Sequence, residues 1–457
     1  MREVRLINRV SDPRSLRYAW KNLNKQNKYS HGISGITVQK FEENLEEHLS
    51  NISKEIRQGI YRFMPNRAVA IQKPNKTYRP LQIPEIRDRV VLKAIAMELE
   101  NQFRVLLSES KGVSFAYQKG TGIRHAFEKI EEHYGTGSVI ILEADIVNFF
   151  GTVNKDSLLH NDIFPKLPDD TLNQLITDAL NQKVVGVEDL PKAQAEAFKG
   201  IDGGIPQGNP LSPLLSNIYL RPFDDFAIAR GSKMVRYADD FVVMCSSKED
   251  AQTTFNEMKK FLRDRLKLNL YDLGSKSSIT NPKSNNFVFL SIQFDGLRKF
   301  PSLENVEKFK NKIRSVCNTS TGELSVIELL TKVKNRYEGW LSAFFFTDVD
   351  RYEKGLDYFI DRQLFLALAK MDWKFSSGSK GSLPYEYRQT NESKDCLSKG
   401  QRFSSGVPRM STHLIRIRQE EPNQIDTAKT TDTSNRGGAK MGQFNLLKKF
   451  INWFTGK

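Results

Sequence analysis

Two adjacent carboxylates, Asp239 and Asp240, lie between two short apolar, β-prone runs in the stretch Met234–Met244. This pattern predicts a β-hairpin made of a strand, a tight acidic turn and a second strand. Apolar flanks of this kind belong in a core, where a pair of negative charges is unfavourable unless a cation or a partner compensates it. Clustered carboxylates prefer hard divalent cations, Mg²⁺ above all. Taken alone, the hairpin is compatible with a metal site and equally with a plain surface turn.

Composition limits the class of protein. The chain has 457 residues, enough for two or three packed units, and is 39% hydrophobic and 27% charged. No apolar run approaches a membrane span and the N-terminal residues lack signal-peptide features, so we expect no membrane partner and a cytoplasmic location. Three isolated cysteines predict a reducing compartment, with neither disulfides nor a zinc site. The net charge of +15 favours nucleic acid as a partner over a merely solubilising surface.

Upstream of the acidic hairpin, residues 1–64 carry apolar side chains at helical spacing and predict a helical extension. Residues 67–83 predict a second hairpin, with Lys73, Lys76 and Arg79 around its tip. A basic hairpin suits a triphosphate or a nucleic-acid backbone. The competing interpretation is a charged edge that prevents aggregation.

A third carboxylate has the same context as Asp239. The strongly apolar stretch at residues 139–150 predicts a buried strand, and this strand ends at Asp145. Between this strand and the acidic hairpin, residues 203–213 are dense in Gly and Pro, which predicts a rigid loop that opens a helix. The backbone of such a loop can approach a ligand closely.

The C-terminal third divides by composition. Residues 304–373 predict helices, whereas residues 374–440 are rich in Ser, Gly, Thr, Lys and Arg and predict a linker or a disordered basic arm. Residues 441–457 place apolar and basic side chains at roughly helical spacing and predict a short amphipathic helix.

Three carboxylates on two strands, a basic hairpin and a Gly/Pro loop together suit phosphoryl transfer. Two metal ions about 4 Å apart can activate an attacking oxygen and stabilise the leaving group. Little remains for the protein beyond positioning and neutralising charge.

The order of these motifs resembles that of reverse transcriptases, and among them the bacterial group II intron-like branch, over residues 30–370. The resemblance implies an α+β right-hand polymerase with fingers, an antiparallel-sheet palm and a helical thumb. Together with composition and helical spacing, it divides the chain into a helical N-terminal extension, fingers and palm, thumb, basic arm and short helix, at residues 1–64, 65–295, 296–373, 374–440 and 441–457. The implied partners are an RNA template, the nascent DNA and dNTPs.

The resemblance also implies roles for individual residues. Asp145, Asp239 and Asp240, with the carbonyl of Ile146, would hold two Mg²⁺ ions, for which Mn²⁺ can substitute. Lys276 resembles the lysine that protonates pyrophosphate, although Ser277 follows it where the family usually has Thr. The dNTP-binding positions are Lys73 and Arg79 for the triphosphate, Phe150 against a ribose 2′-OH, and Gln207 and Gly208 beside the nascent base pair.

Departures from the family pattern narrow the branch. Gly151 stands where the family usually carries Asp, a position that holds no metal. The retron Val-Thr-Gly thumb signature is absent, and the segment Tyr337–Trp340 resembles the thumb of intron-type enzymes. No His/Cys nuclease domain follows it. The pattern therefore resembles domesticated enzymes such as the bacterial reverse transcriptases of antiviral defence, which copy a dedicated non-coding RNA.

Alternatives remain at two levels. The chain also fits an intron maturase or an RNA-binding scaffold with secondary polymerase activity, and an RNA-templated RNA polymerase, against which Phe150 argues. At single positions, Asp240 can orient Asp239 instead of binding metal, Lys276 can be a solvated lysine and Phe150 a core residue. The sequence leaves open the template RNA, the priming mode, the product, the oligomeric state and the function of the arm.

Overall fold

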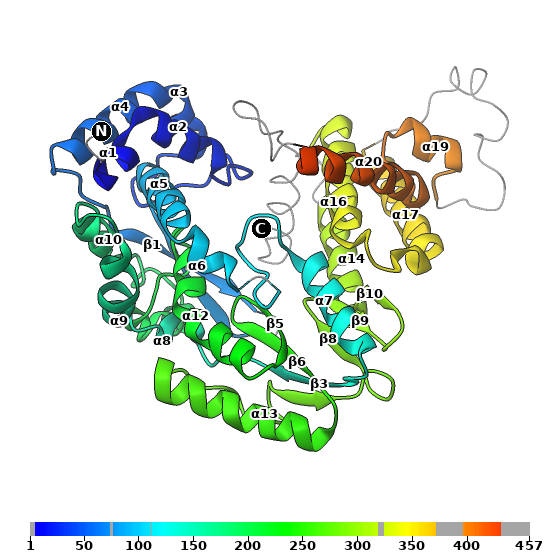
Figure 1. Cartoon of the computed structure of the whole chain (residues 1–457). Helices are drawn as coiled ribbons and strands as arrows, with labels where there is room; N and C mark the ends of the chain where they lie inside the picture. Colours follow the sequence, from blue (N-terminus) through cyan, green and yellow to red (C-terminus); the bar gives the residue numbers. More distant parts are fainter. Residues whose placement is uncertain (1–4, 74–75, 111, 319–323, 372–395, 431–457) are drawn as a thin grey trace. The chain divides into compact units, whose positions relative to one another are not determined.

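The computed structural model describes residues 5–73, 76–110, 112–318, 324–371 and 396–430 (Figure 1). The chain separates into two compact units, Met1–Asn281 and Pro282–Lys457. Helices and largely antiparallel sheets make up both units, which confirms the predicted α+β class.

The predicted helical N-terminal extension is present as four helices, and they pack on one another and on α5, Ile86–Gln102. Asp12 caps the second helix by accepting a hydrogen bond from the amide of Arg14, and Pro13 occupies its first turn, where the missing N–H costs nothing. Trp20 and Phe41 join two of the helices, with ring centroids 5.3 Å apart. The four helices are α1 (Leu6–Ser11), α2 (Pro13–Asn22), α3 (Val38–Glu43) and α4 (Leu45–Arg57).

The basic hairpin forms as predicted. Strands β1 (Asn66–Gln72) and β2 (Tyr78–Ile83) pair antiparallel, with Ile71 opposite Arg79. A short strand, β4 (Val184–Val185), adds in parallel to the other edge of β1. Pro80 is accommodated because β2 is an edge strand of this sheet.

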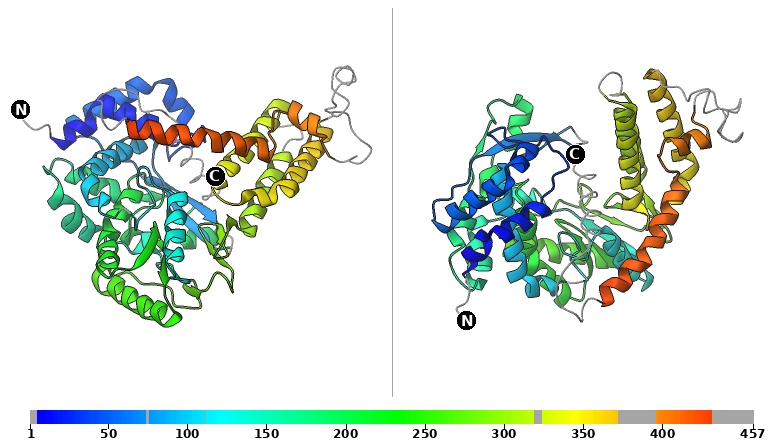
Figure 2. Two further views of the ribbon diagram at one scale, coloured as in Figure 1. Left: turned by 45° about the vertical axis from the view of Figure 1, so that its right-hand side comes forward. Right: turned by 90° about the horizontal axis from the view of Figure 1, so that it is seen from above.

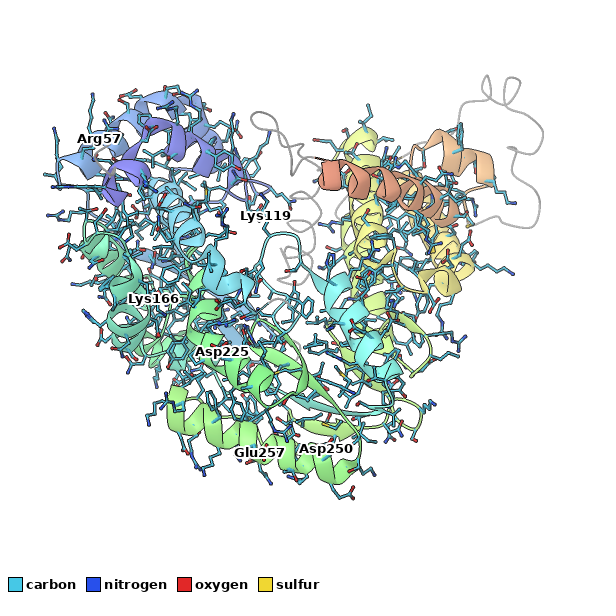
Figure 3. All side chains as sticks on the ribbon, viewed as in Figure 1. Arg57, Lys119, Lys166, Asp225, Asp250 and Glu257 are labelled. Atoms are coloured by element: carbon cyan, nitrogen blue, oxygen red, sulfur yellow. The ribbon has the colours of Figure 1, made fainter. Side chains whose placement is uncertain are left out.

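The acidic hairpin also forms, in a four-stranded antiparallel sheet of order β5-β6-β3-β7. Its strands are β5 (Lys233–Tyr237), β6 (Asp240–Cys245), β3 (Ile140–Ala144) and β7 (Ser278–Thr280). Strand β6 is buried on both faces from Phe241 to Cys245. Its coverage includes α12 (Ser212–Ala229), through Phe223 and Phe241 with ring centroids 5.1 Å apart, and α13 (Lys248–Phe261), on which Asp250 and Glu257 are labelled in Figure 3. We identify this sheet as the palm.

Shorter elements connect the two sheets of the first unit. α7 (Ile123–Gly135) packs against β5 and β6. The others are α6 (Arg104–Ser108), α8 (Phe149–Thr152), α9 (Lys155–Ser157), α10 (Asn173–Leu180), α11 (Lys192–Ala195) and short 3₁₀ or π turns at Leu158–Ile163, Phe164–Lys166, Glu196–Phe198, Ile201–Gly203 and Leu262–Leu266.

The second unit begins with a three-stranded antiparallel sheet of order β10-β9-β8. Helices α14 (Leu303–Asn318), α16 (Val326–Phe344) and α17 (Glu353–Lys370) follow, with a 3₁₀ turn at Val349–Tyr352. Trp340 stacks on Phe309 at 4.8 Å between ring centroids and donates from Nε1 to Asn305 Oδ1 at 2.9 Å. These helices correspond to the predicted helical thumb, and the buried aromatic contact joins α14 to α16. The strands are β8 (Phe287–Phe289), β9 (Ile292–Phe294) and β10 (Lys299–Pro301).

The expectation of a linker or disordered arm over residues 374–440 is wrong for residues 396–430. These form α19 (Lys399–Ser404) and α20 (Met410–Thr430), and α20 packs on α16 and α17 (Figure 2). The basic composition misled the prediction because Arg402 is buried, 2.7 Å from Asp361 Oδ1. Residues 374–395 and 431–440, and the amphipathic helix predicted at 441–457, lie outside the described residues.

Candidate active site

The acidic turn presents Asp239 and Asp240 at one end of the palm sheet. Tyr237 pairs with Asp240, so Ala238 and Asp239 form a two-residue turn. Ala238 has φ +61°, in the left-handed region that residues other than glycine seldom adopt. Removal of the Asp239 carboxyl group from water raises its pKa, and the charge of Asp145 adds to the effect.

Asp145 follows β3 directly and joins the same end of the sheet. Ala144 pairs with Phe241, so the next pair in this antiparallel register sets Asp145 beside Asp240. The Asp240 side chain remains partly open to solvent, but surrounding protein atoms limit hydration of its carboxyl group and raise its pKa; the charges of Asp239 and Asp145 raise it further. The structure thus brings the three predicted carboxylates into one electrostatic cluster.

The backbone after Asp145 is held by a neighbouring extended segment. The amide of Tyr271 donates to the Asp145 carbonyl at 3.0 Å, and the amide of Val147 donates to Asn269 at 2.8 Å. Ile146 lies between these bonds in an antiparallel bridge to Leu270. The two flanking bonds do not use the Ile146 carbonyl, which is consistent with its predicted role as a ligand.

Lys276 reaches the carboxylates from the turn before β7. Its Nζ lies 3.3 Å from Asp145 Oδ2 and 4.2 Å from the centroid of the Tyr271 ring. Partial burial acts to lower the pKa of Lys276, but its contacts with Tyr271 and Asp145 outweigh this and raise it, so the ammonium form is favoured. Ser277, which replaces the usual Thr, is buried and donates to the Tyr271 carbonyl at 2.6 Å. Ser277 therefore closes this turn.

The basic hairpin places positive charge near the same cluster. Burial lowers the pKa of Lys73, and the positive charges of Arg79 and Lys276 lower it further, whereas Asp145 opposes them. Arg79 in turn acts to lower the pKa of Asp239. The tip is closed by a hydrogen bond from the Lys73 amide to the Thr77 carbonyl at 2.7 Å. Lys73 and Arg79 therefore lie within electrostatic range of the carboxylates.

The Gly/Pro loop fits between Phe150 and β2. The amide of Ile205 donates to the Phe150 carbonyl at 2.8 Å, and a Cβ on Gly204 would lie 1.9 Å from that oxygen. The Gln207 carbonyl accepts from the Gln82 amide at 2.7 Å. Gly208 has φ +108°, and a Cβ there would lie 2.6 Å from the Gln82 carbonyl oxygen. Only glycine fits these two positions without a shift of the backbone.

The side chains of Phe150 and Gln207 have different surroundings. Phe150 is half-buried and meets the buried ring of Phe149 edge-on, with centroids 5.5 Å apart. Gln207 Oε1 is buried without a hydrogen-bond partner among the described residues.

A Cβ on Gly151 would lie 2.4 Å from Asn148 Nδ2, so the aspartate usual in the family requires Asn148 to move. The departure at Gly151 is thus matched by the local packing.

The donor set fits hard divalent cations. Within the described ranges no three Asp, Glu, His or Cys side chains form a ready-made metal cluster. However, burial raises the pKa of both Asp239 and Asp240, and the charge of Asp145 raises both further; a bound cation relieves this repulsion. The ion pair with Lys276 partly neutralises the negative charge of Asp145. Carboxylate and carbonyl oxygens are the ligands that Mg²⁺ and Mn²⁺ favour.

Sequence reasoning missed a buried cluster behind the acidic turn, formed by Arg236, Asp224 and Asn217. The available signal was Arg236 itself, a charge inside an apolar strand, which requires a buried partner.

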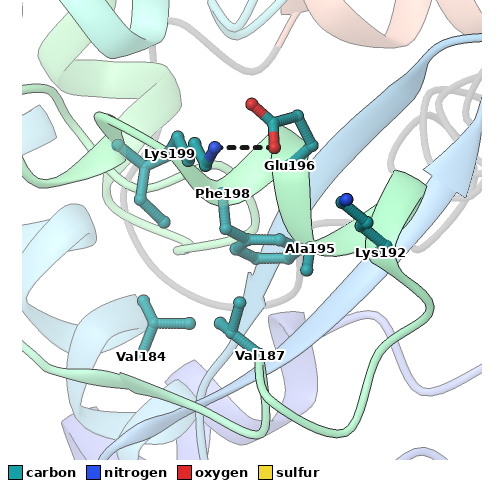
Figure 4. Close-up of a pocket in the computed structure, with 8 residues that line it drawn as sticks. Val184, Val187, Lys192, Ala195, Glu196, Phe198 and Lys199 are labelled. Atoms are coloured by element: carbon teal, nitrogen blue, oxygen red, sulfur yellow. Dashed lines mark ion pairs between the residues drawn. The ribbon is translucent and has the colours of Figure 1, made fainter.

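A separate pocket of ≈ 480 Å³ lies beside β4 (Figure 4). Its rim carries the ion pair Lys199–Glu196 at 2.8 Å. None of the predicted site residues lines it: the lining consists of Val184, Val187, Lys192, Ala195, Glu196, Phe198, Lys199 and Ile201.

Comparison with protein families gives a match over residues 71–294 to the model described as reverse transcriptase (RNA-dependent DNA polymerase). Protein YkfC of Escherichia coli (strain K12) is 26% identical over 329 residues, covering 64% of this chain and 82% of that protein. The group II intron-encoded protein LtrA of Lactococcus lactis subsp. cremoris is 25% identical over 301 residues, covering 52% of this chain and 48% of LtrA. The match thus spans about half of LtrA.

Among solved structures, a partial Cas6-RT-Cas1–Cas2 complex matches at 23% identity and a TM-score of 0.35, covering 57% of this chain and 43% of that chain. Apo telomerase from Candida tropicalis matches at 11% identity and a TM-score of 0.41, covering 72% and 63%. Among the described residues, no helix combines the length and apolarity needed to cross a membrane.

Proposed function

Since residues 71–294 are a reverse transcriptase domain of the group II intron-like branch, we propose that this chain is an RNA-templated DNA polymerase that copies a dedicated structured non-coding RNA. The observation that carries the proposal is the convergence of Asp145, Asp239 and Asp240 at one end of the palm sheet. Lys276 and the basic hairpin supply positive charge at the same place.

Asp145, Asp239 and Asp240, with the Ile146 carbonyl, would hold two Mg²⁺ ions, and Mn²⁺ can take their place. Bound at these residues, the ions would supply activation of the attacking 3′ oxygen and stabilisation of the charge on the leaving group. For Asp240 two alternative roles stay open: it binds metal directly, or it orients Asp239. Its exposed side chain is compatible with direct binding.

The remaining residues bind and orient the nucleotide. Lys73 and Arg79 neutralise the triphosphate oxygens. Lys276 carries a proton on Nζ that it delivers to the departing pyrophosphate. Phe150 occupies the space of a ribose 2′-OH and so favours deoxynucleotides.

We assign Gln207 and Gly208 to the nascent base pair; the close approach of the Gly/Pro loop to β2, through the hydrogen bond from the Gln82 amide to the Gln207 carbonyl, supports this assignment. The unpartnered Gln207 Oε1 offers a hydrogen-bond acceptor there. We propose the domain division 1–64, 65–295 and 296–373 for extension, fingers with palm, and thumb.

In biological terms we propose that the RNA template, the nascent DNA and dNTPs are the partners, that the chain acts in the bacterial cytoplasm, and that its role is antiviral defence. The net charge of +15 supports a polyanionic partner.

The test is sequencing of RNA and DNA that co-purify with the chain from its host, in the wild type and in Asp239→Ala/Asp240→Ala. One dominant RNA, with complementary DNA only in the wild type, is the expected result. The same RNA without DNA in either sample, in infected as in uninfected cells, would instead indicate a maturase or an RNA-binding scaffold.

A further inference from the structure

A buried guanidinium lies directly behind the acidic turn. Arg236 on β5 is 0% exposed and donates from Nε and Nη2 to the two carboxylate oxygens of Asp224, at 2.7 and 2.6 Å. Its Nη1 donates to the Ala238 carbonyl at 2.8 Å and to Asn217 Oδ1 at 3.2 Å. The forked, planar guanidinium makes these contacts simultaneously, which a single ammonium cannot do.

The partners of Arg236 come from one helix. Asn217 and Asp224 are seven residues apart on α12, which puts them on one face of the helix. Asn217 also donates from Nδ2 to the Ala116 carbonyl at 2.8 Å. The backbone of Arg236 binds the same segment, because its amide donates to Val113 at 2.7 Å and its carbonyl accepts from Phe115 at 3.0 Å. One buried cluster therefore holds both the acidic turn and residues 113–116.

Each of the two carbonyls held by this cluster belongs to a strained stretch of backbone. Ala238, at φ +61°, immediately precedes Asp239, and Ala116 immediately precedes Tyr117, at φ +59°. The left-handed conformation is unfavourable for a residue with a side chain, because its Cβ crowds the following carbonyl oxygen. Such strain persists only where the surroundings over-determine it, and it concentrates at functional sites. The hydrogen bonds from Arg236 and Asn217 provide that constraint.

The electrostatics of Asp239 involve groups from both strained segments. Burial of its hydroxyl raises the pKa of Tyr117 to about 12, and the charge of Asp239 contributes to this rise. The charge of Arg236 in turn acts to lower the pKa of Asp239. Asp239 is therefore in electrostatic contact with the tyrosine and with the buried arginine. Lys119, two residues after Tyr117, is labelled in Figure 3 and shows where this segment lies.

We propose that Arg236, supported by Asp224 and Asn217, is a positioning residue that holds the acidic turn through the Ala238 carbonyl and so fixes Asp239 as a metal ligand. The inference rests on the proposed polymerase function, which requires Asp239 as a ligand. Arg236 is fully buried, so it acts through the Ala238 carbonyl and makes no contact with substrate.

The test compares Arg236→Lys with Arg221→Lys in the full chain. Arg221 is a matched control because it is also a buried arginine, 8% exposed, that donates to Ser110 Oγ at 2.6 Å and Glu109 at 3.1 Å. Mn²⁺ binding without nucleic acid is measured by electron paramagnetic resonance of the free ion. We expect Arg236→Lys to weaken Mn²⁺ binding roughly 10–100-fold, as loss of a group that orients a ligand does. Arg221→Lys retains wild-type affinity.

If the ion pair between Arg236 and Asp224 only stabilises the fold, we expect a different result. Wild-type Mn²⁺ affinity in folded Arg236→Lys would overturn the positioning role, however much the melting temperature falls. If Arg236→Lys does not fold, Asn217→Ala takes its place, because it removes one support and leaves the Arg236–Asp224 ion pair. Unchanged Mn²⁺ affinity in folded Asn217→Ala would then overturn the inference.

Asp239→Asn separates this inference from the proposed function. If Asp239→Asn binds Mn²⁺ as tightly as the wild type, the metal assignment itself fails and the positioning role fails with it. If Asp239→Asn loses binding and Arg236→Lys does not, only the positioning role is wrong. A rise in the Mg²⁺ concentration needed for half-maximal kcat in Arg236→Lys, with an unchanged KM for template, gives independent support.

Discussion

The ammonium group of Lys276 lies 3.3 Å from Oδ2 of Asp145, a contact that joins the turn before β7 to the end of β3. This contact and the Tyr271 ring raise the pKa of Lys276 against the opposing effect of burial, so the side chain carries its proton at neutral pH. A protonated lysine at this position is suited to donate a proton to pyrophosphate.

Replacing this proton donor should slow chemistry more than binding. Lys276→Gln is expected to lower kcat by about 10²-fold, within the usual contribution of a general acid, and to leave the KM for dNTP nearly unchanged. Steady-state and single-turnover primer extension measure the two effects. Lys259→Gln is the control, because Lys259 is a surface lysine paired with Asp272. Equal kcat values for the two variants would remove Lys276 from the chemistry.

Phe150 sets the preference for deoxynucleotides in our account. Phe150→Ala is expected to raise the kcat/KM for ribonucleotides relative to deoxynucleotides by roughly 10–10²-fold, because the ring no longer fills the space of the 2′-OH. Phe150→Tyr retains the ring and should retain discrimination. Incorporation of matched rNTP and dNTP on one RNA template gives the ratio. If Phe150→Ala discriminates as well as the wild type, Phe150 is a packing residue only.

Gly208 tests the close approach of the Gly/Pro loop to β2. Gly208→Ala adds a Cβ 2.6 Å from the Gln82 carbonyl oxygen at φ +108°. It should therefore displace Gln207 and raise the KM for dNTP, in addition to the roughly 1–2 kcal/mol of backbone strain. Gly231→Ala is the matched control, because Gly231 has φ +71° with no atom within 4 Å of the added Cβ. We expect it to reduce stability alone, and an equal rise in KM for both variants would contradict the assignment of the loop.

The packing of residues 396–430 has a consequence for stability. Arg402 is 1% exposed and pairs with Asp361 at 2.7 Å and Asp357 at 3.5 Å. Arg402→Met leaves two buried carboxylates short of their partner and should lower the free energy of unfolding by about 3–5 kcal/mol. Arg418→Met breaks a solvent-exposed pair with Asp350 and should cost less than about 1 kcal/mol. Urea denaturation followed by tryptophan fluorescence measures both, and equal stabilities of the two variants would mean that the buried Arg402 pair contributes no more than an exposed one.

The elements that carry the site were predictable because their signals are local. Alternating apolar residues on either side of an acidic turn or of a Lys-rich turn specify a hairpin, and both hairpins form. Asp145 was grouped with Asp239 and Asp240 because all three carboxylates lie at the ends of apolar strands, and the resemblance to reverse transcriptases then gave them a shared role. Sequence spacing alone does not place strand β3 beside β6.

The features that escaped prediction depend on partners distant in sequence. Arg236 meets Asp224 twelve residues away and Asn217 nineteen residues away, on a helix whose facing side is set by tertiary packing. Arg402 meets Asp361 across 41 residues, so a basic segment that reads as solvated is instead anchored in a core. Buried charge pairs of this kind leave no periodic pattern in the sequence.

The central claim is tested most directly by dTTP incorporation on a poly(rA)–oligo(dT) substrate with Mg²⁺, comparing the wild type, Asp239→Asn/Asp240→Asn and the surface control Glu257→Gln. The account predicts DNA synthesis by the wild type and the control, and a loss of at least about 10³-fold in the double aspartate variant, because removing a charge-stabilising group from the reacting centre costs rate factors of that order. Synthesis that survives in the double variant, or a wild type that binds the substrate and extends it no faster than that variant, would contradict the account.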